Sequence, residues 1–303
     1  MVSGEKKAVA AIGNFDGVHL GHQRLIAETA ALARAMDAKL AVVVFVPHPR
    51  RFFRPDDPPF LLTTAQQRDA LLTAHGVERV DHLAFNATLS AMTPEEFVYD
   101  ILKGALDLAG VVTGTEFRFG KGRAGDVGAL KKLCETAGMR ALAVTPAGEG
   151  PQGQKIGSSV IRTALQAGEI RNARRMLGRP WEVEGEIVRG AQLGRTLGFP
   201  TANMTLGELI EPRRGVYAVE AEVKGRLLGG VANFGRKPTV GAPAALLETH
   251  LFDYDGDLYG APMKVRFLDF LRDERKFDGL DALKAQIAAD SIEARARLLS
   301  NAG

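Results

Sequence analysis

The chain has 303 residues, of which 46% are hydrophobic and 25% charged, and its formal net charge is +3. This length allows two domains with separate cores, and the composition is that of a globular protein, not of a disordered or fibrous one. No run of Lys and Arg is dense enough to predict a nucleic-acid-binding surface.

The cysteine content and hydropathy predict the compartment. Cys134 is the single cysteine, so an intrachain disulfide is excluded and a reducing environment is favoured. No apolar stretch reaches membrane-spanning length, and the N-terminus has no signal-peptide pattern. We therefore expect a cytoplasmic protein with no membrane partner.

The first element predicted along the chain is a strand over residues 8–12, followed by a glycine-bearing turn and a helix from about residue 20. This order places backbone N–H groups and a positive helix end against a phosphate. His19 and His22 are three residues apart, so both rings can face one side of the helix start and stabilise charge on a triphosphate. Two alternatives remain open: an ordinary polar turn, and a metal site made of Asp16, His19 and His22.

Residues 13–22 read G-N-F-D-G-V-H-L-G-H, which resembles the signature of prokaryotic riboflavin kinase/FAD synthetases in the HxGH nucleotidyltransferase superfamily. The resemblance implies that the two histidines are catalytic in an adenylyl transfer. The implied ATP-binding residues in this segment are Gly13, Asn14, Phe15, Asp16, Gly17, His19 and His22.

The next elements alternate between strand and helix. Strands are predicted over residues 40–46, 77–85, 109–113 and 141–145, and helices over residues 63–76, from Thr93 as cap, and over residues 127–137, which contain Cys134. This alternation predicts a parallel, Rossmann-like α/β sheet. Cys134 is expected to be a buried, inert thiol.

Three further segments of this half match the family pattern. Pro47, His48 and Pro49 follow a buried strand, where ligands bind in parallel sheets, and resemble the family's flavin-pocket segment. Glu116 stands in a G-x-D-F-x-F-G-like segment where aspartate is usual, and the resemblance implies a flavin contact. Ser158, Ser159 and Arg162 match an S-[ST]-x-I-R element and are implied to bind the ATP phosphates, although either serine is also a good N-cap.

The pattern changes at residues 178–180, where we place a domain boundary, giving domains 1–179 and 180–303. Period-two alternation over residues 181–187, and strands over residues 216–223, 227–233, 246–252 and 263–268, predict a small antiparallel β-barrel. Lys224-Gly225 is a predicted hairpin turn. A final helix over residues 280–299 is expected to turn Leu280, Leu283, Ile287, Ile292 and Leu299 inward.

The barrel's candidate chemistry begins at residues 194–203, G-R-T-L-G-F-P-T-A-N. Thr201 and Asn203 are two apart and project the same way in an extended segment. Their oxygens suit a Mg²⁺ ion held together with substrate phosphates. The segment closely resembles the riboflavin kinase signature, which implies ATP binding by Gly194, Gly198, Phe199, Pro200 and Thr201. A later segment, N-F-G-R-K-P-T, also matches, with Lys237 where arginine is usual.

Glu248 lies in an E-T-H-L segment that also matches, and the resemblance implies that it is the catalytic base of the kinase step and a flavin contact. A solvated strand glutamate is the alternative, and Asp253, Asp255 and Asp257 compete as carboxylates. Arg272 and Phe277 are further candidates for the flavin site of this domain.

The resemblance covers nearly the whole chain and implies a bifunctional enzyme. The barrel would convert riboflavin and ATP to FMN and ADP, and the first domain would convert FMN and ATP to FAD and pyrophosphate, both with Mg²⁺. An adenylyltransferase with one activity and an accessory barrel is the alternative, and a nucleic-acid-binding module is a third, disfavoured hypothesis. No obligate protein partner is inferred.

Overall fold

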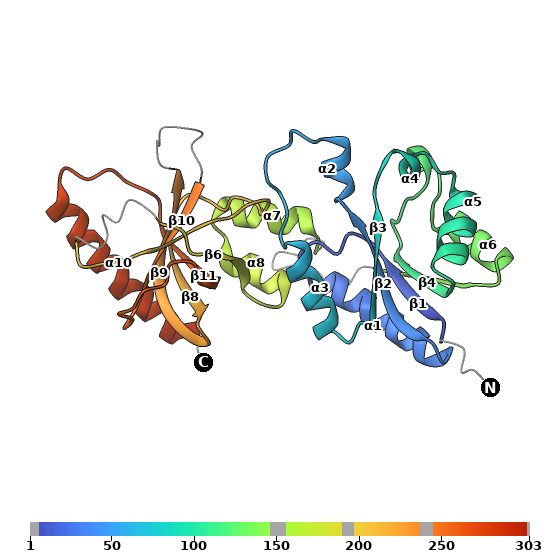
Figure 1. Ribbon diagram of the computed structural model, residues 1–303, viewed down its shortest axis with the longest axis horizontal. Coiled ribbons are helices and arrows are strands. Elements are labelled where there is room, and N and C mark those ends of the chain that lie inside the picture. The colour runs from blue at the N-terminus through green and yellow to red at the C-terminus, as the bar shows by residue number, and fades with distance from the viewer. Residues whose placement is uncertain (1–5, 146–155, 190–196, 237–244, 302–303) are drawn as a thin grey trace. The chain divides into compact units, whose positions relative to one another are not determined.

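The computed structural model describes residues 6–145, 156–189, 197–236 and 245–301 (Figure 1). The chain divides into two compact units, residues 1–57 with 65–156 and residues 58–64 with 157–303. A five-stranded parallel sheet lies in the first unit and a six-stranded antiparallel sheet in the second. The predicted fold class is therefore confirmed.

The first unit is a parallel sheet in the order β3-β2-β1-β4-β5. Its strands are β1 (Ala8–Ile12), β2 (Lys39–Val46), β3 (Arg79–Ala84), β4 (Leu108–Gly114) and β5 (Arg140–Val144). Its helices are α1 (Leu20–Ala35), α2 (Pro49–Phe53), α3 (Ala65–Ala74), α4 (Ala87–Ala91), α5 (Pro94–Glu96), the π-helix η1 (Phe97–Ala105), the 3₁₀ turn η2 (Lys121–Arg123) and α6 (Val127–Thr136). Each predicted strand and helix of this half has its counterpart, and Thr93 caps α5 in a capping box with Glu96.

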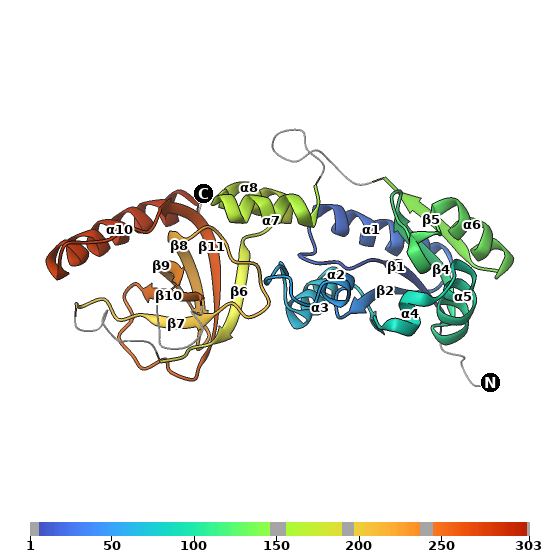
Figure 2. The same cartoon turned by 90° about the horizontal axis from the view of Figure 1, so that it is seen from above.

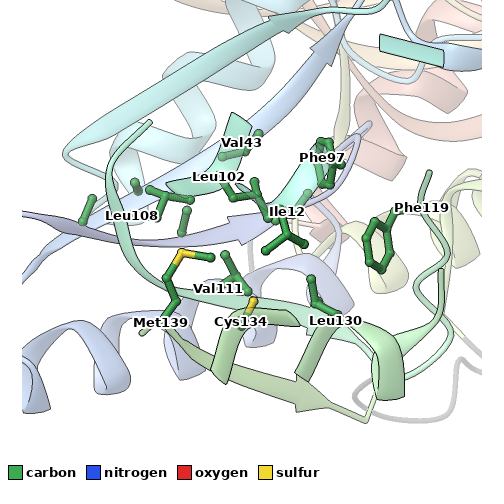
Figure 3. Packing of buried hydrophobic residues seen from close by; sticks show 14 residues of the cluster. Ile12, Val43, Phe97, Leu102, Leu108, Val111, Phe119, Leu130, Cys134 and Met139 are labelled. Atoms are coloured by element: carbon green, nitrogen blue, oxygen red, sulfur yellow. The ribbon is translucent and has the colours of Figure 1, made fainter. Parts of the chain in front are cut away.

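A hydrophobic core covers each face of this sheet. On one face, Ile12, Val43 and Val111 meet side chains of η1 and α6, among them Leu102 and Cys134 (Figure 3). On the other face, α1 and α3 pack against β1 and β2. Cys134 is fully buried, and burial raises the pKa of its thiol to about 11, as expected for an inert cysteine. Because β1 is buried along its whole length, it holds the start of the following turn in a fixed position.

The second unit is a nearly closed barrel in the strand order β6-β11-β8-β9-β10-β7. Its elements are α7 (Ser158–Ala167), α8 (Ile170–Leu177), β6 (Trp181–Glu186), β7 (Ala202–Thr205), β8 (Gly215–Val223), β9 (Arg226–Arg236), β10 (Ala245–Leu251), β11 (Pro262–Arg272) and α10 (Leu280–Asn301). Val188, just after β6, bridges Asn203 on β7. The Lys224-Gly225 turn joins β8 to β9 with positive φ at both residues, as tight hairpins require.

The inward face predicted for α10 is wrong in part. The helix packs across β8, β9 and β11 (Figure 2), but Ile292 is 71% exposed and Leu299 79%, and Leu280 is exposed as well. Asp290 and Ala294 are buried instead. The carboxylate of Asp290 accepts two hydrogen bonds from Arg272, so a charged residue occupies the inward stripe and the apolar pattern misidentifies the face.

Residues 58–64 lie in the second unit although 92 residues separate them from its next segment. Leu61 donates its N–H to the carbonyl of Glu208 and accepts from the N–H of Ile210. Trp181 Nε1 donates to the carbonyl oxygen of Leu62 over 2.9 Å, and Leu62 is fully buried. This segment is therefore part of the folded core of the second unit.

Candidate functional sites

Three of the predicted binding segments follow neighbouring parallel strands of the first unit. Residues 13–22 follow β1, residues 47–49 follow β2, and Glu116 follows β4. β1 lies between β2 and β4, so the connections from β1 and β4 leave in opposite directions. Ligands of open α/β sheets bind at such a switch point, at the carboxyl ends of the strands. The three segments thus lie at one edge of this unit.

The turn after β1 has a strained backbone. Phe15 has φ 51° and Val18 has φ 38°, although both are fully buried non-glycine residues, and Gly17 has φ 85°. A β-branched residue at positive φ is a rare conformation that costs on the order of 1–3 kcal/mol. Strain of this kind concentrates at binding and catalytic sites.

The two histidines predicted to be catalytic form a stacked pair. Their ring centroids are 3.7 Å apart at an interplanar angle of 17°. His19 caps α1, since its Nδ1 accepts the N–H of His22 over 3.3 Å. A Cβ on Gly21 would lie 3.1 Å from the His19 ring, so the glycine of H-x-G-H leaves room for the pair.

The electrostatics of this pair keep His22 neutral. Burial, and then the neighbouring charge of His19, lower the pKa of His22 well below its usual value. The buried Nδ1 of His22 and Oδ1 of Asn14 have no hydrogen-bond partner among the described residues. A polar ligand bound at this helix start would supply the missing hydrogen-bond partners of both atoms.

The metal alternative for Asp16, His19 and His22 gains no support. The described residues contain no group of three or more His, Cys, Asp or Glu side chains arranged to hold a metal ion. Asp16 is buried within the turn. Binding of an anionic ligand by this segment stays a prediction.

Three of the flavin candidates of the first unit, Pro47, His48 and Pro49, lie at the start of α2. Pro49 begins this helix and His48 caps it, because Nδ1 of His48 accepts the N–H of Arg50 over 3.1 Å. Pro47 precedes this cap. Glu116 is exposed in the turn after β4. The structure therefore gives His48 a capping role, and its contact with a flavin stays a prediction.

An aromatic group beside this loop was not predicted. The rings of Phe52, Phe53 and Phe85 are mutually edge-on, with centroids 5.1–5.7 Å apart. Phe53 is 64% exposed, which is unusual for a large apolar ring. The Phe52-Phe53 pair, which begins three residues after Pro49, was the available sequence signal.

Ser158, Ser159 and Arg162 lie on α7, in the second unit. Gly157 is the N-cap, so neither serine fills the capping role that was the alternative. Arg162 donates from Nε to the carbonyl of Phe60 over 2.7 Å, and its guanidinium lies 5.5 Å from the centre of the Phe60 ring. Binding of ATP phosphates by these residues stays a prediction.

The second unit has a cavity of about 310 Å³ beside β10. Five residues predicted from the sequence line it: Phe199, Thr201, Glu248, Arg272 and Phe277. Arg272 is held by Asp290 through two hydrogen bonds of 2.8 and 2.7 Å, and its guanidinium lies 5.9 Å from the Phe277 ring centre. The structure thus brings together candidates that are separated by up to 78 positions in the sequence.

Glu248 occupies the middle of a polar row across three strands. It is directly opposite Asn203 on β7 and Asn233 on β9. Directly opposed residues share a face with Cβ atoms about 5 Å apart. Glu248 therefore lies between two amide side chains in the strand register, and its role as the base stays a prediction.

A second cavity of about 350 Å³ adjoins the same segment. Its lining residues include Pro200, Thr201, Thr249, Tyr254 and Tyr259. Thr201 lines both cavities. A group passed from one cavity to the other would therefore pass Thr201.

The fit of these residues to Mg²⁺ depends on Asn203. Its Nδ2 donates to the carbonyl of Thr201, but its Oδ1, in a side chain only 2% exposed, has no partner among the described residues. An orphaned amide oxygen and the hydroxyl of a threonine two residues earlier are hard oxygen donors of the type that Mg²⁺ prefers. Gly198 precedes this segment with φ 87°, whereas Gly194 and Lys237 lie outside the described residues.

Comparison with known proteins decides the family. Residues 2–160 match the family model of FAD synthetase, and residues 177–298 match that of riboflavin kinase. A bifunctional riboflavin kinase/FMN adenylyltransferase of Pseudomonas fluorescens is 41% identical over 289 residues, which cover 95% of this chain and 92% of the relative. The chain belongs to the bifunctional riboflavin kinase/FMN adenylyltransferase family.

Further members of this family agree over the same length. The relative in Escherichia coli K12 is 38% identical and covers 96% of this chain and 93% of its own length. The Bacillus subtilis relative is 37% identical, with 96% and 92% covered. A crystal structure described as a macrolide-efflux protein from Streptococcus pneumoniae is 32% identical, has a TM-score of 0.86 and covers 94% of this chain and 92% of that one. None of the helices in the described ranges is both long and apolar enough to cross a membrane.

Sequence reasoning within the riboflavin kinase/FMN adenylyltransferase pattern missed two neighbours of Glu248. His250 lines the same cavity as Glu248, and Thr249 lines the second cavity with its Oγ1 buried and without a partner among the described residues. Period-two alternation along β10 predicts this division of faces. The faces of His250 and Thr249 could therefore have been derived from the predicted strand.

Proposed function

We propose that the chain is a bifunctional enzyme that makes FMN from riboflavin and ATP in its second unit and FAD from FMN and ATP in its first. The observation that carries this proposal is the cavity lined by Glu248, Thr201 and Arg272, in a chain whose relatives carry both activities over their whole length. ADP and pyrophosphate are the other products.

In the kinase step, Glu248 is the general base. It takes the proton of the riboflavin 5′-hydroxyl as that oxygen attacks the γ-phosphorus of ATP, and the β–γ bond breaks to release ADP. Riboflavin occupies the cavity beside β10 and the nucleotide occupies the adjoining one. Thr201 borders both cavities, so it lies beside the transferred group.

Thr201 and Asn203 hold Mg²⁺ in this proposal, and the orphaned Oδ1 of Asn203 supports the assignment. The ion would neutralise charge on the β- and γ-phosphates when bound. Asn233 and Asn203 flank Glu248 in the ladder, and Glu248 lines the cavity.

In the adenylyl transfer, the start of α1 binds the triphosphate of ATP. The neutral His22 and the capping His19 donate hydrogen bonds to the charge that develops as pyrophosphate leaves. The phosphate of FMN attacks the α-phosphorus, and the aromatic group around Phe53 offers its flavin ring an apolar surface. Ser158, Ser159 and Arg162 lie on α7 in the second unit, and the sequence pattern alone supports them as proposed phosphate contacts.

Three further expectations concern the compartment and the partners of the protein. The protein acts in the cytoplasm, needs no obligate protein partner and binds no nucleic acid. We propose the boundary between the two activities at residues 179–180, although residues 58–64 and 157–179 also belong to the second unit of the structure. A fragment of residues 181–303 that phosphorylates riboflavin would support this boundary. A folded but inert fragment would contradict it.

Incubation of the full chain with riboflavin, ATP and Mg²⁺, followed by chromatography of the flavins, tests the proposal. Both FMN and FAD are expected, and both should disappear when EDTA is added. FAD from supplied FMN, without any FMN from riboflavin, would instead identify a single-activity adenylyltransferase with an accessory barrel.

A further inference from the structure

His250 makes a contact that the proposed kinase step does not yet use. Its Nδ1 lies 2.9 Å from the carbonyl oxygen of Pro200, which directly precedes Thr201. A carbonyl oxygen only accepts hydrogen bonds, so Nδ1 carries the proton. The side chain of one strand thereby holds the backbone of the segment that borders both cavities.

The ring of His250 is fixed in its orientation by two aromatic neighbours. Phe199 lies edge-on at 5.3 Å and Phe252 edge-on at 6.0 Å, measured between ring centroids. Phe252 is itself buried and covered by the guanidinium of Arg295 at 4.2 Å. An imidazole clamped in this way directs its N–H in one direction.

His250 and Glu248 are two residues apart on β10 and line the same cavity. The backbone of one strand therefore sets the position of the proposed base. Through the bond from His250 to Pro200, it also sets the position of Thr201 and Asn203. A fixed distance between these groups is what an in-line transfer requires.

We propose that His250 is a positioning residue of the kinase step: its Nδ1–H bond to Pro200 holds Thr201 and Asn203 in register with Glu248. This inference rests on the proposed kinase function of the second unit. It predicts that the bond matters for catalysis and for the metal-dependent part of nucleotide binding, but not for riboflavin binding.

The test compares three substitutions in the full chain. His250→Phe keeps an aromatic ring and removes the donor. In His250→Asn, the amide nitrogen is close to the position of Nδ1, whereas in His250→Gln it is close to that of Nε2. Asn and Gln share polarity and charge, so a purely structural role of His250 would not separate them.

We expect kcat of FMN formation to fall about tenfold in the Phe and Gln variants, the cost of one hydrogen bond lost in the transition state. The Asn variant should retain most of the wild-type rate, and KM for riboflavin should stay within about twofold in all three. Calorimetry with ADP should show a smaller gain in affinity on adding Mg²⁺ for the Phe and Gln variants than for the Asn variant.

The same chain supplies two controls. FAD formation from supplied FMN should be unchanged in each variant. His82→Phe removes another imidazole hydrogen bond, the 2.7 Å contact from Nε2 to Asp69, and should leave FMN formation unchanged.

Equal rates for the Asn and Gln variants, or wild-type kinetics in the Phe variant, would overturn the inference. If the unmodified chain formed no FMN, the proposed kinase function would fail instead, and the ADP calorimetry would still report on His250.

Discussion

Replacement of Leu62 by alanine should destabilise the kinase unit, although Leu62 lies inside the segment that matches FAD synthetase. Leu62 is fully buried, and its carbonyl accepts the indole N–H of Trp181. A buried Leu→Ala change costs about 3 kcal/mol within a typical span of 2–5. For a unit of about 150 residues this lowers the melting temperature by roughly 10 °C.

Trp181 makes this prediction measurable, because it is the single tryptophan of the chain and is buried in the second unit. Its fluorescence follows the unfolding of that unit alone. Leu72→Ala is the matched control: Leu72 is also fully buried and inside the FAD synthetase match, but it packs in the core of the first unit. On heating, Leu62→Ala should lose FMN formation first and Leu72→Ala should lose FAD formation first. If both variants lost the same activity first and left the Trp181 transition unchanged, the assignment of residues 58–64 to the second unit would be wrong.

Three further predictions concern the two candidate sites. His19→Ala or His22→Ala should lower FAD formation by about a hundredfold or more and spare FMN formation, and unchanged FAD synthesis would refute the role of the pair. Because the pKa of His22 is lowered in the folded state, the unfolded chain takes up a proton below about pH 6.5 that the folded chain resists, so stability should fall as the pH drops from there. Urea unfolding of the first unit at several pH values between 7.5 and 5.5 measures this fall in the free energy of unfolding. The fall should be smaller in His22→Phe than in the unmodified chain. Glu248→Gln should reduce FMN formation at least a hundredfold, with riboflavin binding within a few-fold and FAD synthesis unchanged. If Asp253→Asn produced this effect instead, the wrong carboxylate would have been chosen.

The turn after β1 was predictable because its determinants are local. Gly17 and the two histidines lie within ten positions of one another in one short segment, with a strand before and a helix after it. Period two along β10 likewise predicts which side of the strand carries Glu248. The sequence therefore predicts the local geometry in which the candidate residues of both sites stand.

The misassigned elements depend on distant partners. Asp290 lies inward on α10 only because Arg272 pairs with it, and no pattern within the helix reveals that pairing. Residues 58–64 pack with Trp181, 119 positions beyond Leu62. The ring group of Phe52, Phe53 and Phe85 joins a helix to a loop 32 positions later. Contacts of this separation follow from tertiary packing, which local periodicity does not encode.

The early position of residues 58–64 has a consequence for synthesis on the ribosome. The chain passes between the two units after residues 57, 64 and 156, so part of the second unit's core is translated before most of the first unit. At 5–20 residues per second, roughly 6–24 s pass between the synthesis of Leu62 and that of its partner Trp181. During that interval an apolar segment containing Phe60 and Leu62 lacks its native partners, and exposed apolar surface of this kind is what chaperones recognise.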